Sequence, residues 1–137
     1  MGLGASAWEI TIYNNVKNCD ANGDTMYRIL SGTDQNCYTF DRDMPGVGCV
    51  QFNNGGATHG GCGGGSLIPV SAFIKPFGPA QCTFYYEENC GNRDRVSITV
   101  RNWQDTCQNV IYRFSDGFTL DPRSFRCTVR IPLLRVS

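Results

Sequence analysis

The stretch CTFYYEENCGNRDRVSITV, residues 82–100, decides the fold class. It begins with strand-forming residues, continues through a turn rich in Gly and Asn after Cys90, and ends in an alternating run from Val96. A similar succession lies near the N-terminus, where Thr11-Ile12-Tyr13 precedes Cys19 and a turn containing Asn22-Gly23. Two such copies in one chain indicate a duplicated β unit.

Three pairs of cysteines keep the two copies in register. Their members lie 71, 70 and 78 residues apart, so the length changes only in the last loop of the unit. The pairs are Cys19 and Cys90, Cys37 and Cys107, and Cys49 and Cys127. The other two cysteines, Cys62 and Cys82, lie outside the repeat.

Short runs rich in Ile, Val, Thr, Tyr and Phe, bounded by Gly, Asn and Asp, predict eight strands and no helix. We therefore expect an all-β fold of two duplicated Greek-key units packed as a disulfide-stapled β-sandwich. The expected strands are Glu9–Tyr13, Thr25–Leu30, Cys37–Phe40, Cys49–Phe52, Thr83–Tyr86, Val96–Val100, Val110–Phe114 and Phe125–Leu133.

The 137 residues are expected to form one domain. Residues 1–7 are interpreted as a leader or processing remnant, since MGLGASA lacks the charged and apolar regions of an intact signal peptide. Within the domain at 8–137, the first half spans 8–52, a Gly/Pro-rich connection spans 53–81, and the second half spans 82–137. The apolar part of the connection, residues 66–81, is either core or an exposed patch suited to a membrane or partner.

Eight cysteines in a chain of this size predict four disulfides and a secreted protein. Structural zinc is the rival, but it needs closely paired ligands, and the smallest gap here is the eight residues from Cys82 to Cys90. From the repeat we expect equivalent bridges within each half. The expected pairs are Cys19–Cys37 and Cys90–Cys107, leaving Cys62–Cys82 and Cys49–Cys127.

The twelve basic and twelve acidic side chains cancel, which argues against nucleic acid as a partner. Their distribution is uneven, because residues 1–67 carry three basic and six acidic side chains, and residues 68–137 carry nine and six. Eight of those nine basic residues are arginines, which suit a carboxylate or phosphate partner. The alternative is a solvated face with intramolecular ion pairs.

The paired aromatics, the acidic or amide-rich turn, the Gly and the following strand resemble the βγ-crystallin Greek-key motif. Phe84, Tyr85, Glu87 and Gly91 carry this resemblance in the second copy, and Tyr13 and Gly23 carry it in the first. Small cysteine-rich secreted fungal proteins, including killer-toxin-like proteins and plant-pathogen effectors, share that architecture. The resemblance therefore implies a small secreted cysteine-rich protein of this fungal killer-toxin-like or effector type.

Two departures from that motif bear on function. Cysteines, Cys19 and Cys90, replace its second aromatic residue. The calcium-binding members carry an acidic or amide pair followed by Ser/Thr-Ser, whereas this chain has Pro45–Val50 and Asp121–Cys127 at those places. Too few oxygen ligands remain for a hard cation, so no metal and no cofactor is expected.

Catalytic groups do not stand out either. The single His59 lies among glycines, which are poorly suited to holding a general base in place. Glu87 and Glu88 are adjacent and would point to opposite faces of a strand. Asp41 and Asp43 could share one face or lie on a loop rim. We expect a protein that is not an enzyme.

The leading hypothesis is a secreted, monomeric effector or toxin-like protein that binds a protein, glycan or membrane target. Arg and Trp dominate interface energetics, which selects the candidate binding residues. They are Arg93, Arg95, Arg101, Arg123, Trp103 and Tyr86. The alternatives are a lectin-like module in which Trp8, Trp103 or exposed tyrosines stack on sugar rings, and a small secreted hydrolase or enzyme inhibitor.

Overall fold

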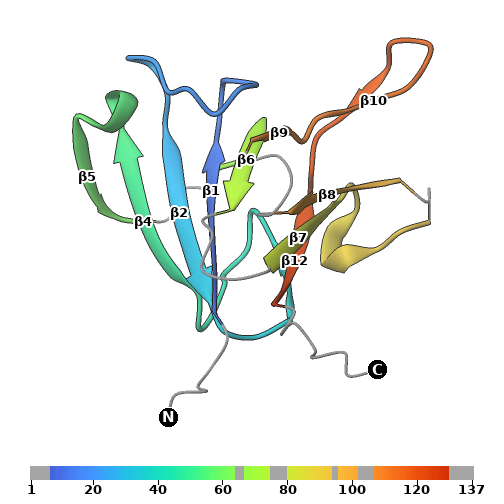
Figure 1. Ribbon diagram of the computed structural model, residues 1–137, viewed down its shortest axis with the longest axis horizontal. Coiled ribbons are helices and arrows are strands. Elements are labelled where there is room, and N and C mark those ends of the chain that lie inside the picture. Colours follow the sequence, from blue (N-terminus) through green and yellow to red (C-terminus); the bar gives the residue numbers. More distant parts are fainter. Residues whose placement is uncertain (1–6, 64–66, 75–79, 94–95, 102–106, 130–137) are drawn as a thin grey trace, which may run out of the picture.

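The computed structural model describes residues 7–63, 67–74, 80–93, 96–101 and 107–129. The described part is all-β, with antiparallel strands and two short 3-10 turns (Figure 1). No helix among these residues is long and apolar enough to cross a membrane. The predicted fold class is confirmed.

The strands form a six-stranded sheet, a four-stranded sheet and a small hairpin. The six-stranded sheet has the order β5 (Thr58–Gly61), β4 (Gly48–Asn53), β2 (Tyr27–Gly32), β1 (Trp8–Tyr13), β6 (Ser71–Ile74) and β9 (Gln108–Asn109). The four-stranded sheet has the order β3 (Cys37–Thr39), β12 (Ser124–Val129), β7 (Ala80–Tyr85) and β8 (Ser97–Arg101). The hairpin consists of β10 (Tyr112–Arg113) and β11 (Thr119–Leu120).

The two halves of the chain follow one topology. In the first half the order is β2, β1, β6, followed by β9 from the second half. In the second half it is β8, β7, β12, followed by β3 from the first half. Each half therefore contributes three strands to its own sheet and sends its third strand to the other sheet, which makes two interlocked Greek keys.

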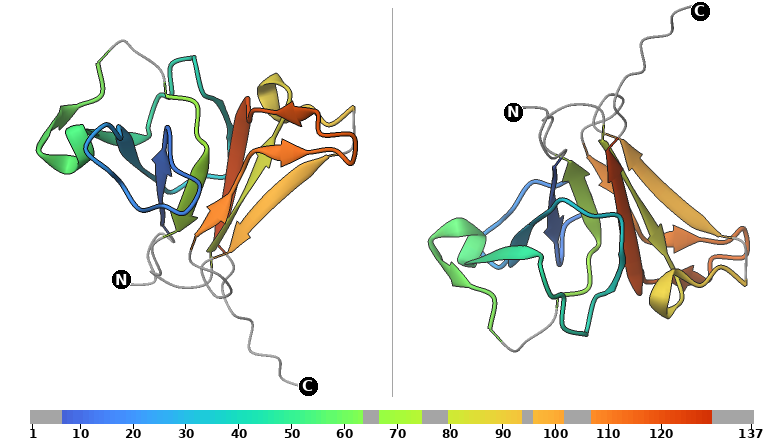
Figure 2. Two further views of the ribbon diagram at one scale, coloured as in Figure 1. Left: turned by 90° about the horizontal axis from the view of Figure 1, so that it is seen from above. Right: turned by 90° about the horizontal axis from the view of Figure 1, so that it is seen from below.

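The two halves also carry insertions at the same place. The hairpin of β4 and β5 lies between the third and fourth strands of the first half, and the hairpin of β10 and β11 lies between those of the second. Figure 2 shows β4 and β5 on the side of the larger sheet that is remote from the smaller sheet. The insertions are the main additions to the duplicated frame.

The core lies between the two sheets. Ile10 and Ile12 lie on one face of β1, and Thr11 and Tyr13 on its other face are buried as well. Trp8 meets Phe125 of the other sheet edge to face, with ring centroids 5.8 Å apart. Phe125 also stacks on Phe40 of the first half, with ring centroids 5.2 Å apart, so aromatic packing joins the halves.

The described part of the apolar segment, residues 67–74 and 80–81, contributes to this core. Leu67 is 3% exposed and Ile74 is 1% exposed, and β6 forms the fourth strand of the first half. The expectation that Cys49–Phe52 fills that place is wrong, because β4 is part of the insertion. Residues 53–81, expected to be a connection, contain both β5 and β6.

All eight cysteines are in disulfides, but the expected pairing is wrong. The third strands cross between sheets, so Cys37 at the start of β3 and Cys107 just before β9 each meet a loop cysteine of the opposite half. The remaining bridges join register partners of β7 and β12 and close the β4–β5 hairpin. The observed pairs are Cys19–Cys107, Cys37–Cys90, Cys82–Cys127 and Cys49–Cys62.

Candidate functional site

The candidate site is built around the loop that follows β7. A single 3-10 turn, η2 (Glu88–Cys90), forms there, and Asn89 and Cys90 both have positive φ angles of 55° and 59°. Asn tolerates this region better than most residues, whereas Cys90 needs support from its surroundings. That support comes from several covalent and polar contacts.

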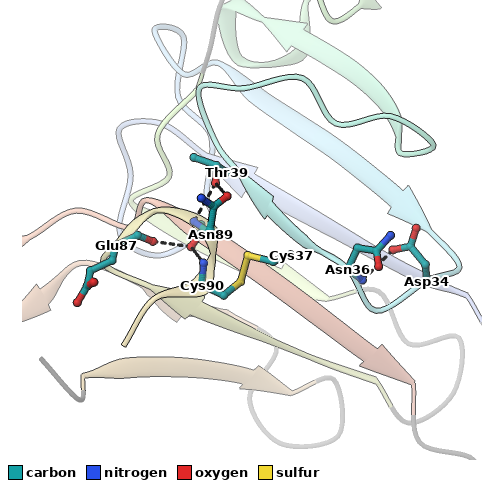
Figure 3. The surroundings of a disulfide bond; sticks show 8 residues. Asp34, Asn36, Cys37, Thr39, Glu87, Asn89 and Cys90 are labelled. Carbon is teal, nitrogen blue, oxygen red and sulfur yellow. Dashed lines mark hydrogen bonds between the residues drawn. A yellow bond between two sulfur atoms is a disulfide. The ribbon is translucent and has the colours of Figure 1, made fainter. Parts of the chain in front are cut away.

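Figure 3 shows how the turn is fixed. Cys90 is joined to Cys37 by a disulfide, and its backbone N–H donates to Ser124 Oγ at 2.8 Å. The backbone N–H of Asn89 donates to Thr39 Oγ1 at 3.1 Å. Because Thr39 and Ser124 lie on neighbouring strands β3 and β12, both halves of the chain hold the turn rigidly.

The rigid turn positions two carboxylates against three arginines. Glu88 accepts from Arg42 at 2.5 Å through one oxygen and from Arg123 at 3.1 Å through the other. Glu87 accepts from Arg93 Nε at 2.9 Å. Arg42 comes from the first half, whereas Arg93 and Arg123 come from the second, so this arginine cluster spans the junction of the halves.

Exposure determines what the arginine cluster contributes. The side chains of Arg42, Arg93 and Arg123 are 59%, 89% and 46% exposed. Ion pairs that face water in this way stabilise a fold by about 0–1 kcal/mol each. Each guanidinium has five N–H donors in a planar fork. A surface that stabilises the fold little, yet holds its cations in place, is suited to recognising carboxylate or phosphate groups.

The predicted binding residues lie in different places. Arg93 and Arg123 belong to the arginine cluster. Arg101 lies at the far end of β8, since it pairs with Gln81 whereas Ser97 pairs with Tyr85. Arg95 and Trp103 lie outside the described residues.

Tyr86 offers little surface for binding. Its side chain is buried, with the residue 8% exposed, and its hydroxyl donates to the carbonyl of Val110 at 2.6 Å. Arg42, by contrast, is not among the binding residues that the sequence predicts. Nothing in its surroundings in the sequence shows that β3 carries it across to the second half, so only the topology reveals it.

The residues weighed for sugar stacking and catalysis also have clear positions. Trp8 is 1% exposed and its indole N–H donates to the Asp34 carbonyl at 2.8 Å, so it cannot stack on a sugar. His59 is exposed and its ring stacks on Phe52 with centroids 5.3 Å apart. Among the described residues, no group of three His, Cys, Asp or Glu side chains could hold a metal ion.

Comparison with known proteins identifies the family to which the chain belongs. No curated protein and no solved structure matches the chain. Residues 8–127 match a family described as the C-terminal domain of the secreted LysM effector LysM14. The match starts with β1 and covers both Greek-key halves, with all four disulfides inside it. The chain therefore belongs to this family of secreted effector domains.

Proposed function

We propose that the domain acts outside the cell as the target-binding domain of an effector and does not catalyse a reaction. The observation that carries this proposal is the arginine cluster of Arg42, Arg93 and Arg123. The disulfide framework and the effector family support an extracellular site of action. The target is expected to present carboxylate or phosphate groups, because planar guanidinium forks match them with two parallel hydrogen bonds.

The finer resemblance to βγ-crystallin-like secreted proteins is part of the same proposal. It is supported by two four-stranded units of equal topology that exchange their third strands. In such a frame the loop after the first strand of each unit lies over the junction, and the second copy of that loop carries Glu87 and Glu88. The frame would then present the arginine cluster as a rigid surface.

The proposal can be tested with a pair of charge-matched variants. Arg93→Ala with Arg123→Ala removes two cations from the arginine cluster, and Lys17→Ala with Arg113→Ala removes two exposed cations from elsewhere. Extracellular partners captured by crosslinking to the native domain would be purified and their affinities measured by surface plasmon resonance at several salt concentrations. We expect the first variant to bind at least about tenfold more weakly and the second to bind within about twofold of the native domain.

Equal affinity of the native domain and of the Arg93/Arg123 variant would refute this choice of surface. Turnover of a partner by the native domain, seen as cleavage or covalent change, would refute the non-catalytic role. Far-ultraviolet circular dichroism of each variant would show that loss of binding does not come from loss of fold.

A further inference from the structure

The smaller sheet has a polar outer face, which is turned away from the larger sheet (Figure 2). Phe125 and Cys127 of β12 are buried in the core, so Arg126 between them lies on the outer face. Val100 of β8 is buried in the core, so the next residue, Arg101, lies on the outer face as well. The four described strands of this sheet contain no Asp or Glu. The charge that they place on the outer face is therefore positive.

These two arginines have no partner within the described protein. The side chains of Arg101 and Arg126 form no hydrogen bond or ion pair with any other residue that the structure describes. Arg126 is exposed and Arg101 is half-buried. They differ in this respect from the arginine cluster, whose members all contact a carboxylate. Intramolecular ion pairs therefore do not account for this part of the surface.

The duplication shows that the fold does not require either arginine. Arg126 of β12 occupies the place that Phe73 occupies in β6, opposite the same position of the first strand of its half. By the same register, Arg101 of β8 occupies the place that Ser31 occupies in β2. A frame that accepts Phe and Ser at these places does not need Arg there. The two guanidiniums are therefore available for recognition.

The spacing of the two arginines suits an extended polypeptide. Arg126 lies opposite Thr83 of β7, and Arg101 lies opposite Gln81, two residues away on the same strand. Two strand spacings and two residues place their Cα atoms roughly 12 Å apart. In an extended chain, residues four positions apart lie on one face and about 13 Å from each other. Two carboxylates on such a segment would each meet a guanidinium.

The surroundings of the arginines also favour a polypeptide over a membrane. The Thr83 and Thr99 hydroxyls, which share a hydrogen bond of 3.0 Å, lie on this face, and Gln81 and Thr128 are paired beside them. These groups can hydrogen-bond a peptide backbone. An anionic membrane would gain only about 1 kcal/mol from each arginine near its surface, and the chain as a whole has no net charge.

This face continues into the arginine cluster. The turn η2 lies against one end of it, because the outward side chains of Thr39 and Ser124 accept hydrogen bonds from the backbone of η2 (Figure 3). Arg126 follows Ser124 by two residues on the same face of β12. The arginine cluster therefore borders the face that carries Arg101 and Arg126, and both surfaces are complementary to negative charge.

We propose that the outer face of the smaller sheet binds an acidic, extended segment of a partner protein, with Arg101 and Arg126 each donating to a carboxylate. This inference rests on the proposed function, since it extends the same target-binding surface and names the class of its partner.

A nine-residue peptide of alternating Thr and Glu would serve as the probe, because alternation places its carboxylates on one face of an extended chain. The matched peptide has Gln in place of Glu. Two-dimensional ¹⁵N–¹H NMR spectra of the native domain would follow the Nε–Hε signals of Arg101 and Arg126. The expected result is a saturable shift of both signals with the acidic peptide, weakened by added salt, and no shift with the Gln peptide.

Arg101→Gln with Arg126→Gln should weaken binding of the acidic peptide by about tenfold or more, because two charge-assisted hydrogen bonds are lost. The control, Lys17→Gln with Arg113→Gln, neutralises two exposed cations elsewhere and should keep the affinity within about twofold. The proposal is overturned if the Arg101/Arg126 variant binds like the native domain or if the Gln peptide binds equally well. It is also overturned if only inorganic phosphate or phosphatidylserine vesicles shift the two signals. The spectra themselves report whether each variant is folded.

The Arg93/Arg123 variant separates this inference from the proposed function. If that variant binds the acidic peptide like the native domain while the Arg101/Arg126 variant does not, the outer face is the peptide site and the arginine cluster is not part of it. If only the Arg93/Arg123 variant loses binding, the arginine cluster stands and the present inference fails.

Discussion

Ser71 and Ser124 make the same two hydrogen bonds in the two halves of the chain. Ser71 Oγ accepts from the Cys19 N–H at 3.2 Å and donates to the Val16 carbonyl at 2.6 Å. Ser124 Oγ accepts from the Cys90 N–H at 2.8 Å and donates to the Glu87 carbonyl at 2.6 Å. Each serine opens the fourth strand of its half and ties it to the loop after the first strand. The duplication therefore extends to individual hydrogen bonds.

We predict that Ser71→Ala and Ser124→Ala destabilise the domain to a similar degree. Both serines are fully buried, and each replacement leaves a backbone N–H and a carbonyl without this partner. The expected loss in free energy of unfolding is about 1–3 kcal/mol for each variant, measured by denaturant titration. Ser97→Ala, an exposed position on β8, serves as the control. A loss at only one of the two serines would contradict their equivalence.

The crossed third strands predict a specific disulfide map. Peptide mapping without reduction should recover Cys19–Cys107 and Cys37–Cys90, each joining the two halves. Pairs confined to one half, such as Cys19–Cys37, would contradict the strand order as well as the pairing.

The bridges should also differ in their contribution to stability. Cys37–Cys90 closes a loop with a sequence separation of 53, whereas Cys49–Cys62 closes one of 13. In the chain-entropy model these loops correspond to about 4 and about 3 kcal/mol. Paired serine replacements at each bridge, compared by thermal unfolding, should show the larger loss for Cys37–Cys90. The reverse order would indicate that native contacts rather than chain entropy dominate.

The sequence was sufficient to predict the duplication and the fold class, because strands and loop cysteines recur at nearly constant offsets. It was insufficient for the pairing, since equal spacing within each half is compatible with bridges inside a half or between halves. Which of these occurs depends on the crossing of β3 and β9, a long-range feature that spacing does not encode.

A second repeat in the sequence would have placed the fourth strand correctly. Leu67, Pro69 and Ser71 recur as Leu120, Pro122 and Ser124, a shared L-x-P-x-S pattern. Both prolines are fully buried at the start of the fourth strands. The cysteine register instead pairs Cys49 with Cys127, which are not equivalent in space. The insertions separate the pattern from the rest of each unit and conceal it.

The candidate site was predicted only in part for a related reason. Arg93 and Arg123 follow from the abundance of arginine in the second half, but Arg42 belongs to the more acidic half of the sequence. It reaches Glu88 because β3 pairs with β12. Tyr86 is the opposite case, because the sequence predicts it as a binding residue and the structure buries it. A tyrosine next to a strand end can lie in the core or at the surface.

Glu88→Gln should separate stability from recognition. It removes the carboxylate that Arg42 and Arg123 share, and these exposed pairs predict a change of about 1 kcal/mol or less in unfolding free energy. The two guanidiniums would lose their common anchor, so the affinity for an anionic partner should change while the fold persists. Denaturant unfolding and surface plasmon resonance on one preparation would measure both. A large loss of stability would show that the cluster is mainly structural.

Alkaline pH provides the last test, through the tyrosines. Burial, with a smaller electrostatic effect of Tyr112, raises the pKa of Tyr86 above its ordinary value of 10.0, and burial also raises the pKa of Tyr13 and Tyr38. A phenol whose pKa is higher in the folded protein than in the unfolded chain stabilises the fold. This stabilisation is fully present at any pH below the pKa of the phenol in the unfolded chain. This contribution is lost as the pH rises above about 10.

Near neutral pH the contribution of these tyrosines to the free energy of unfolding should therefore not change with pH. Above pH 10 the free energy of unfolding should fall. Tyr86→Phe removes the hydrogen bond to Val110 and should cost about 1 kcal/mol at pH 8, but it should make the decline toward pH 11 shallower. Urea midpoints of the native domain and the variant at both pH values would measure the difference. Tyr85→Phe, at the half-buried position next to Tyr86 in the sequence, is the matched control. An identical decline in native and Tyr86→Phe proteins would mean that the buried hydroxyl does not govern alkaline unfolding.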